Sequence, residues 1–180
     1  MKIISAEEVH AALSYPALVD ALEEAYAGKF SMPPRQVFLL DPEGGKDDAF
    51  AVLPSWSDEF IGVKSFTYFP KATEPYKSLY SKIMLFDREH GEPLALVDGT
   101  TVTFWRTAGI SGLATRLLAR EDASSLLVLG TGNLVPYMIL ANASVRPLKK
   151  VMVWGRDPEK ATAVIEQVSA QLPDIDFSVV

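Results

Sequence analysis

Two glycines in the second half of the chain have the spacing of a phosphate-binding turn. The apolar run Ser125–Leu129 predicts a short strand, and Gly130-Thr131-Gly132 follows it at the start of a helical pattern. Such a turn lets a phosphate approach the backbone, and the helix N-terminus offers N–H donors and positive potential. The full dinucleotide fingerprint has a small residue three places after the second glycine, where this chain has Val135. The match is partial, so cofactor binding and a plain tight turn both remain as interpretations.

The residues after the next predicted strand, Lys150–Trp154, bear on the choice of cofactor. An Asp or Glu at this place commonly holds the ribose hydroxyls of NAD, whereas an Arg accommodates the 2′-phosphate of NADP. Here Gly155 leaves room and Arg156 supplies the charge, which favours NADP, with NAD as the alternative. Asp157 before Pro158 is typical of a helix cap rather than of a ribose ligand. The competing interpretation of Arg156 is a solvated surface residue.

Arg106 is a cation in an unusual setting. It lies near the start of a predicted helix, where the helix dipole disfavours positive charge. It also shares a helical face with Ile110, Leu113 and Leu117, and we expect that face to point inwards. Such a cation requires an anion, either the carboxylate of a ligand or an internal Asp or Glu. The spacing does not separate these two alternatives.

Two further cations precede it. Lys64 shares one face of a predicted strand, residues 60–69, with Phe60, Phe66 and Tyr68. A lysine among aromatic residues either extends to an edge or neutralises a buried anion. Arg35 follows two prolines. Spacing cannot show whether the fold brings these cations together.

The elements that position these residues form two regions. The first mixes helices with strands. A short helix is expected to open at Ser5, and further helices near 15–28 and 101–119; strands are expected at 36–40, 49–53, 60–69, 80–87 and 93–97. The second reads strand, helix, strand, helix, strand, with strands at Ser125–Leu129, Lys150–Trp154 and 175–180. Strands separated by helices predict right-handed crossovers and a parallel sheet. The fold class is therefore α/β.

Composition excludes several classes of function. The chain has 180 residues, of which 48% are apolar and 22% charged, and its net charge of −6 is not that of a general nucleic-acid binder. With no cysteine there is no disulfide, thiolate nucleophile or zinc ribbon, and only two histidines argue against a metal site. No apolar run approaches the ~18–20 residues that span a bilayer, so no membrane partner is expected. The early acidic residues do not fit a secretory signal, and the cytoplasm is the expected location.

Several ordered motifs together resemble the ornithine cyclodeaminase/mu-crystallin family, over nearly the whole chain. The most specific is the segment Thr103-Phe104-Trp105-Arg106-Thr107-Ala108, which is followed by Ala114, Leu118-Ala119-Arg120 and the glycine turn. The other markers are Pro33-Pro34-Arg35, Gly62-Val63-Lys64 with Phe69-Pro70, and Leu85-Phe86-Asp87 with Gly91-Glu92-Pro93-Leu94-Ala95.

The resemblance implies a two-domain subunit that forms a homodimer and acts on a small amino or imino acid with NAD(P). Residues 1–119 correspond to an α+β substrate-binding and dimerisation domain, and residues 120–180 to a partial Rossmann domain of βαβαβ order. Carried over by position, the resemblance implies a substrate-carboxylate cluster and a cofactor site. The cluster is Arg35, Lys64 and Arg106, with Lys64 also the candidate catalytic residue; the cofactor residues are Ser78, Arg106, Gly130, Gly132, Asn133, Leu134 and Arg156.

Two departures limit what the resemblance transfers. Many members carry Ala-Gln-Ala after the glycine pair, where this chain has Asn133-Leu134-Val135. Asn133 is expected to cap the following helix, and the larger Val135 to tighten its packing on the strand. The family's acidic catalytic residue belongs to a second half of the Rossmann domain, which we expect beyond Val180.

The resemblance implies three functions, in order. The first is NAD(P)H-dependent reduction of a cyclic ketimine carboxylate such as pyrroline-2-carboxylate, because Arg156 favours NADP and hence reduction. The second is cyclodeamination of ornithine to proline and ammonia, and the third another amino-acid dehydrogenation. A non-catalytic protein of the mu-crystallin kind, which binds NADPH and a ligand, is the contrasting class.

Overall fold

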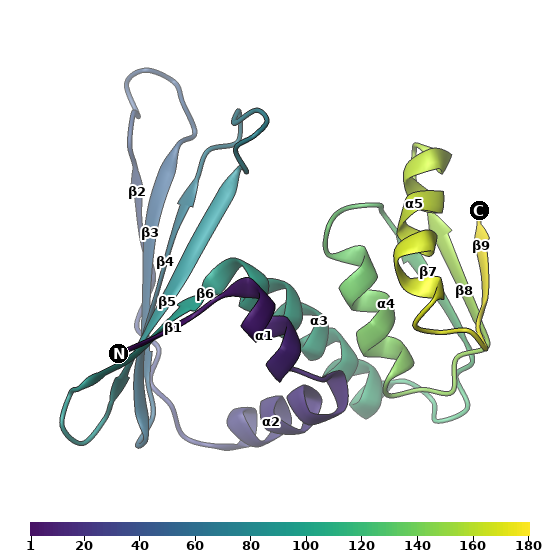
Figure 1. The fold of residues 1–180 in the computed structure, drawn as a ribbon, viewed down its shortest axis with the longest axis horizontal. Coiled ribbons are helices and arrows are strands. Elements are labelled where there is room, and N and C mark those ends of the chain that lie inside the picture. Colours follow the sequence, from purple (N-terminus) through teal and green to yellow (C-terminus); the bar gives the residue numbers. More distant parts are fainter. The chain divides into compact units, whose positions relative to one another are not determined.

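The structure is a computed structural model that describes residues 1–180. The chain forms two compact units, and each contains two separate stretches of sequence (Figure 1). The first unit consists of Met1–Ala12 and Ala27–Thr103, and the second of Leu13–Tyr26 and Phe104–Val180. The boundary predicted at residue 119 separates a substrate-binding domain from a cofactor-binding domain, and this functional division stays a prediction.

The first unit contains a six-stranded sheet with strand order β1-β6-β5-β4-β3-β2. Neighbouring strands are antiparallel except β1 and β6, which are parallel. β1 was not predicted, because a three-residue strand is too short to show a pattern and is defined only by its pairing with β6. The elements of this unit are β1 (Lys2–Ile4), α1 (Ala6–Ala12), β2 (Gln36–Leu39), β3 (Ala49–Trp56), β4 (Phe60–Tyr68), β5 (Leu79–Asp87) and β6 (Pro93–Asp98).

One face of this sheet is lined by small side chains. Ala51 pairs with Phe66, and Phe66 pairs with Ser81, so these three residues share a face. Lys64 lies two residues from Phe66 in β4 and therefore points to the same face. The fully or nearly buried residues of this face are Ala49, Ala51, Ser81, Ala95 and Val97.

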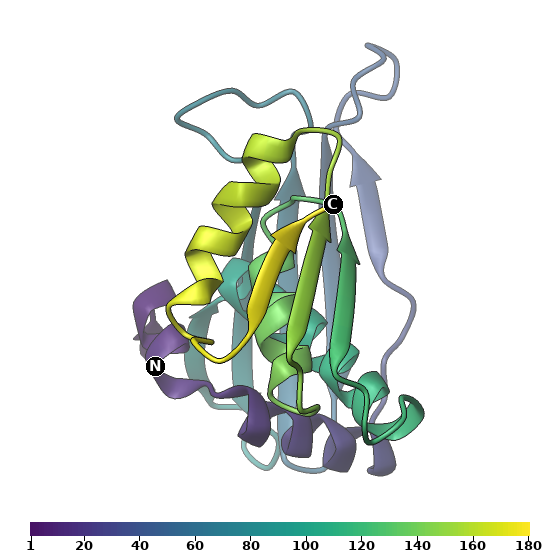
Figure 2. The same cartoon turned by 90° about the vertical axis from the view of Figure 1, so that its right-hand side faces the viewer.

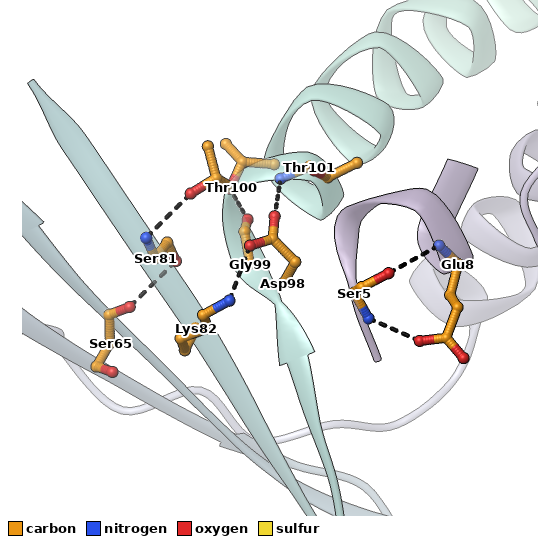
Figure 3. Close-up of polar contacts among 10 residues, drawn as sticks. Ser5, Glu8, Ser65, Ser81, Lys82, Asp98, Gly99, Thr100 and Thr101 are labelled. Atoms are coloured by element: carbon orange, nitrogen blue, oxygen red, sulfur yellow. Dashed lines mark hydrogen bonds and ion pairs between the residues drawn. The ribbon is translucent and has the colours of Figure 1, made fainter. Parts of the chain in front are cut away.

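Helix α1 begins with a capping box, as its sequence predicts. The Ser5 N–H donates to Glu8 Oε2 at 2.9 Å, and the Glu8 N–H donates to Ser5 Oγ at 3.2 Å (Figure 3). Val9, in the next turn, is buried. The reciprocal bonds fix the start of a helix that is too short to be stable by itself.

The second unit ends in three parallel strands with the order β7-β8-β9 (Figure 2). Val151 and Val153 of β8 are fully buried against Ile139 of α4 and Val164 and Val168 of α5. This alternation of strands and helices is the predicted βαβαβ order. The elements are α2 (Tyr15–Ala27), α3 (Gly99–Leu118, whose first five residues belong to the first unit), β7 (Ser125–Leu129), α4 (Val135–Ala143), β8 (Lys150–Trp154), α5 (Pro158–Ser169) and β9 (Asp176–Val179).

The buried face of α3 agrees only in part with the predicted one. Leu113 is buried as predicted, but Leu117 is 60% exposed and Arg106 is also exposed. The buried residues beside Leu113 are Ala108, Gly109 and Gly112. A Cβ at Gly109 would approach the Leu22 side chain to 2.8 Å, and one at Gly112 would approach the Ala141 carbonyl oxygen to 3.1 Å. Small residues mark the contact face because they let α2 and α4 approach the α3 backbone closely.

An aromatic cluster in the second unit contains a buried hydroxyl with no hydrogen-bond partner. Tyr15, at the start of α2, stacks on Trp105 with ring centroids 4.5 Å apart, and its hydroxyl is unpaired. Burial, together with the nearby Tyr137, raises the pKa of Tyr15.

Tyr15→Phe is therefore expected to stabilise the protein by about 1 kcal/mol, since an unsatisfied buried hydroxyl costs about 1–3 kcal/mol. Urea unfolding measures this change, and a less stable variant would show that the hydroxyl has a partner.

None of the helices combines the length and the apolar character needed to cross a membrane.

Candidate functional site

The N-terminus of α3 is held against the sheet of the first unit by a set of polar contacts (Figure 3). Asp98 caps the helix, with its Oδ1 accepting from the Thr101 N–H at 2.9 Å and its Oδ2 lying 3.0 Å from Lys82 Nζ. Partial burial of Asp98 opposes its ionisation, but these hydrogen bonds hold its pKa below the ordinary value. Stability from this cap is thus present above the ordinary pKa of an aspartate and is lost as the pH falls through the lowered one.

Gly99, the first residue of α3, makes this close approach possible. A Cβ there would lie 2.5 Å from Ser81 Oγ and 3.0 Å from the Ser81 carbonyl carbon. The Ser81 N–H donates to Thr100 Oγ1 at 3.0 Å, and the Ser81 hydroxyl donates to the Ser65 carbonyl at 3.1 Å. The first turn of α3 is therefore fixed to β5 through both backbone and side chains.

Lys64 reaches this fixed turn from β4. Its Nζ donates to Thr103 Oγ1 at 2.5 Å, and the Thr103 hydroxyl donates to the Gly99 carbonyl at 2.6 Å. Lys64 is half-buried. Lys64 is thus held beside the first turn of α3 and does not extend to the edge of the sheet. The other interpretation, that Lys64 neutralises an anion, stays a prediction.

The other two site residues predicted in this unit lie at different distances from Lys64. Arg35 directly precedes Gln36, which pairs with Val52, and Lys64 pairs with Leu53, the neighbour of Val52. Arg35 and Lys64 are thus near one row of the sheet, two strand spacings or about 10 Å apart. Ser78 is exposed just before β5, five residues along the strand from the partner of Lys64, which corresponds to roughly 17 Å. Its predicted place near the nicotinamide stays a prediction.

The glycine turn of the second unit directly follows β7. Gly130 has a φ of 128°, which only glycine adopts without strain, and its N–H donates to the Trp154 carbonyl at 2.7 Å. No atom of the chain outside the turn lies within 4 Å of the place where a Cβ would stand on Gly130 or Gly132. The space beside both glycines is therefore open.

The helix after the turn does not begin as predicted. Its N-cap is Leu134, and no side chain caps the helix, so the expectation that Asn133 caps it is wrong. Val135 starts the helix and is buried in the core of this unit, consistent with the predicted tight packing on the strand. Pro136 in the first turn has no N–H to cap, which lessens the need for an Asn133 cap. The side chain of Asn133 is left exposed beside the turn.

Gly155, after β8, is required by the glycine turn itself. A Cβ on Gly155 would approach Thr131 Cγ2 to 2.5 Å. Gly155→Ala is therefore expected to lower the free energy of unfolding by about 1–3 kcal/mol, the usual cost of overpacking. Adding Thr131→Ser, which removes Cγ2, should recover most of that loss.

Urea unfolding of the single and double variants tests this contact. Gly132→Ala is the matched control, since a methyl group there meets no atom outside the turn. Equal losses in the single and double variants would show that Thr131 does not limit the space at Gly155.

Asp157 has the role predicted from its sequence context, whereas the role of Arg156 in cofactor binding stays a prediction. Asp157 caps α5, with Oδ1 accepting from the Glu159 N–H at 3.1 Å and the Lys160 N–H at 3.4 Å. Its carboxylate is thus engaged in the cap. Arg156 is exposed, forms no ion pair, and lies beside the glycine turn because β7 and β8 are adjacent and parallel.

Arg106 belongs to the second unit and is exposed on α3. Within that unit no Asp or Glu forms an ion pair with it, which speaks against an internal acid from the same unit. Arg35 likewise has no ion-pair partner. Both guanidinium groups are therefore available to an anionic ligand within the unit that carries each of them.

Two contributing residues were missed by sequence reasoning. Thr103 was noted only as part of a family motif. A Thr four residues after the Gly that begins a helix can, however, donate its hydroxyl proton to the carbonyl of that Gly, which leaves its lone pairs facing outward. Thr131 was read as the middle of a glycine turn, with no sign that it packs on Gly155. The first had a local signal; the second required the pairing of β7 with β8.

Comparison with known proteins agrees with this arrangement. A sequence profile of the ornithine cyclodeaminase/mu-crystallin family matches residues 2–180. The chain is 50% identical to the Delta(1)-pyrroline-2-carboxylate reductase of Colwellia psychrerythraea, over 98% of this chain and 57% of that protein.

Solved structures show the same fold. The Thermococcus litoralis Delta(1)-pyrroline-2-carboxylate reductase, in complex with NADH and L-proline, has a TM-score of 0.88 at 28% identity. The match covers 100% of this chain and 57% of the Thermococcus chain. An archaeal alanine dehydrogenase dimer with bound NAD has a TM-score of 0.87 at 26% identity, with coverage of 100% and 56%. The chain thus spans little more than half the length of these proteins. The match to the family profile and the identity to the Colwellia reductase confirm the resemblance read from the sequence: the chain belongs to the ornithine cyclodeaminase/mu-crystallin family.

Proposed function

We propose that the whole protein reduces a small cyclic ketimine carboxylate, such as pyrroline-2-carboxylate, to a cyclic amino acid with NAD(P)H. The observation that carries this proposal is the 50% identity, over 98% of the chain, to a curated pyrroline-2-carboxylate reductase. The proposal concerns the whole protein because the chain spans only 57% of that relative.

The residues of the second unit fit a dinucleotide. The glycine turn is open on its outer side, and Gly130 has the backbone conformation of a phosphate-binding turn. In this proposal Gly130, Gly132, Asn133 and Leu134 hold the pyrophosphate. The exposed Arg156 beside them binds a 2′-phosphate, which makes NADPH the preferred cofactor, although the two solved relatives bind NADH and NAD.

The cations bind the substrate by its carboxylate. Lys64 is held beside the N-terminus of α3, and Arg35 lies in nearly the same row of the sheet. In the proposal these two residues and Arg106 form the carboxylate cluster. A guanidinium matches a carboxylate with two parallel hydrogen bonds and fixes the plane of the substrate.

The cofactor, when bound, supplies a hydride to the carbon of the C=N bond. The residues of this chain hold the ring by its carboxylate and keep its nitrogen protonated, so that addition of the hydride leaves a neutral amine. Lys64 either donates the proton to that nitrogen or only neutralises the carboxylate. Kinetics of Lys64 variants separate these roles.

We also propose that the protein acts as a homodimer in the cytoplasm. A dimeric alanine dehydrogenase shares its fold. The edge strand β2 supports the dimer, because Val37, Phe38 and Leu39 are each about half exposed on it. An apolar edge strand is a usual place for a second chain to pack.

The test is whether the whole protein reduces pyrroline-2-carboxylate. The reaction is measured by the loss of NADPH absorbance and by chromatographic detection of proline. Release of ammonia from L-ornithine would instead favour a cyclodeaminase. Failure to oxidise NADPH with any small cyclic ketimine, or with a 2-oxo acid and an amine, would overturn the proposal in favour of a non-catalytic ligand-binding protein.

A further inference from the structure

We infer that Thr103 is a positioning residue for Lys64: its hydroxyl accepts from the lysine and holds the ammonium at one place in the site. This inference rests on the proposed function, in which Lys64 contacts the substrate. The geometry that carries it is the pair of consecutive hydrogen bonds from Lys64 Nζ to Thr103 Oγ1 and from Thr103 Oγ1 to the Gly99 carbonyl.

The direction of these bonds is determined by chemistry. An ammonium group only donates and a carbonyl oxygen only accepts, so the single proton of the Thr103 hydroxyl lies toward Gly99. The lone pairs of the hydroxyl then face Lys64. A hydroxyl whose proton is already committed is a better oriented acceptor than one that rotates freely.

The far end of the pair is fixed by the sheet. Gly99 leaves no room for a side chain against Ser81, and Asp98 caps the same turn while bonded to Lys82 (Figure 3). A shift of this turn would break the contacts to β5 along with the bond from Thr103. The acceptor presented to Lys64 is therefore as rigid as the strand pairing itself.

Lys64 benefits from such an anchor because its stem is flexible. A lysine side chain has about 2 kcal/mol of rotamer entropy, and an ammonium offers no planar fork to orient it. Thr103 is not its sole neighbour, but it is the partner supplied by the fixed end of α3. Positioning in advance of substrate binding lowers the entropic cost of the reacting complex.

The variants are Thr103→Val, which keeps the shape and removes the hydroxyl, and Thr103→Ser, which keeps the hydroxyl. Thr162→Val is the matched control: the Thr162 hydroxyl also donates to the carbonyl four residues earlier, that of Pro158, but no lysine donates to it. Thermal unfolding of all three variants separates loss of a helix contact from loss of the lysine anchor.

The first readout does not require enzyme activity. Competitive acetylation of the whole protein, quantified by mass spectrometry at Lys64 relative to the exposed Lys71, measures how firmly the amine is held. Thr103→Val should raise the relative labelling of Lys64 about tenfold, the effect of losing one hydrogen bond to a charged group. Thr103→Ser and Thr162→Val should label as the wild type does. Unchanged labelling of Lys64 in Thr103→Val overturns the inference.

The second readout is kinetic. Thr103→Val should lower kcat/KM for pyrroline-2-carboxylate about 10- to 100-fold without changing the KM for NADPH, and Thr103→Ser should restore it. Equal losses in the Val and Ser variants would indicate a packing role and overturn the inference. A wild type that shows no reduction at all, while the labelling difference persists, would overturn the proposed function and leave the anchoring of Lys64 established.

Discussion

Lys64→Met in the whole protein is expected to lower kcat/KM for pyrroline-2-carboxylate by about 10²- to 10⁴-fold, the usual contribution of a positioned proton donor. The substitution keeps the apolar stem and removes the charge that now lies 2.5 Å from Thr103 Oγ1. The KM for NADPH should not change, because the proposal assigns cofactor binding to the glycine turn and Arg156 and not to Lys64. Steady-state kinetics with both substrates measures these effects.

The division of the loss between kcat and KM distinguishes the two roles of Lys64. A fall confined to kcat indicates proton donation to the ring nitrogen, whereas a rise confined to KM indicates binding of the carboxylate. Lys64→Arg keeps the positive charge but cannot release a proton, so it should restore activity only in the second case. Lys71→Met is the matched control, an exposed lysine of the same unit. Near-normal activity in Lys64→Met would contradict any direct role.

Arg156→Ala is expected to raise the KM for NADPH about 10- to 100-fold and to leave the KM for NADH nearly unchanged. A charge-assisted hydrogen bond contributes about 1.5–3 kcal/mol, and every 1.4 kcal/mol is a factor of ten in affinity. The physical reason is that only NADPH carries the 2′-phosphate that the exposed guanidinium would bind. Parallel kinetics with the two cofactors measures the ratio.

The neighbouring Asp157 does not complicate the interpretation of this experiment. Asp157 is engaged as the cap of α5, so truncating Arg156 does not release an acidic side chain toward the ribose. Arg120→Ala is the matched control, an exposed arginine in the same unit whose only ion pair is with Asp122. Equal losses for NADH and NADPH would show that Arg156 contacts a part common to both cofactors. A wild type that prefers NADH would contradict the NADP assignment from the outset.

Local patterns were sufficient for the closing part of the fold. β7 and β8 have the predicted bounds because each is an apolar run followed by glycine within two residues, and α5 starts where Asp157 and Pro158 place it. β9 is one residue shorter at each end than the predicted strand 175–180. These ends carry no cap or glycine as distinct as those at the start of α5.

Features that depend on contact with a second segment of the chain could not be predicted from local patterns. Of the large apolar residues from which the inward face of α3 was predicted, Leu113 is buried but Leu117 is exposed. The closest contacts are made by Gly109 and Gly112, because two other helices approach there. Asn133 looked like a helix cap by residue type, but the helix starts one residue later without a side-chain cap. In both places packing between distant segments outweighs the local preference.

The sequence by itself determined most of the strands and helices, the glycine turn, the set of cations and the family, since each depends on short motifs or on their order along the chain. Only the tertiary structure decided which groups meet. Lys64 and Thr103 are 39 residues apart, and their contact depends on the register of β4, β5 and β6 and on the close seat of Gly99 against Ser81. Register and close approach are properties of paired segments, so no single segment encodes them.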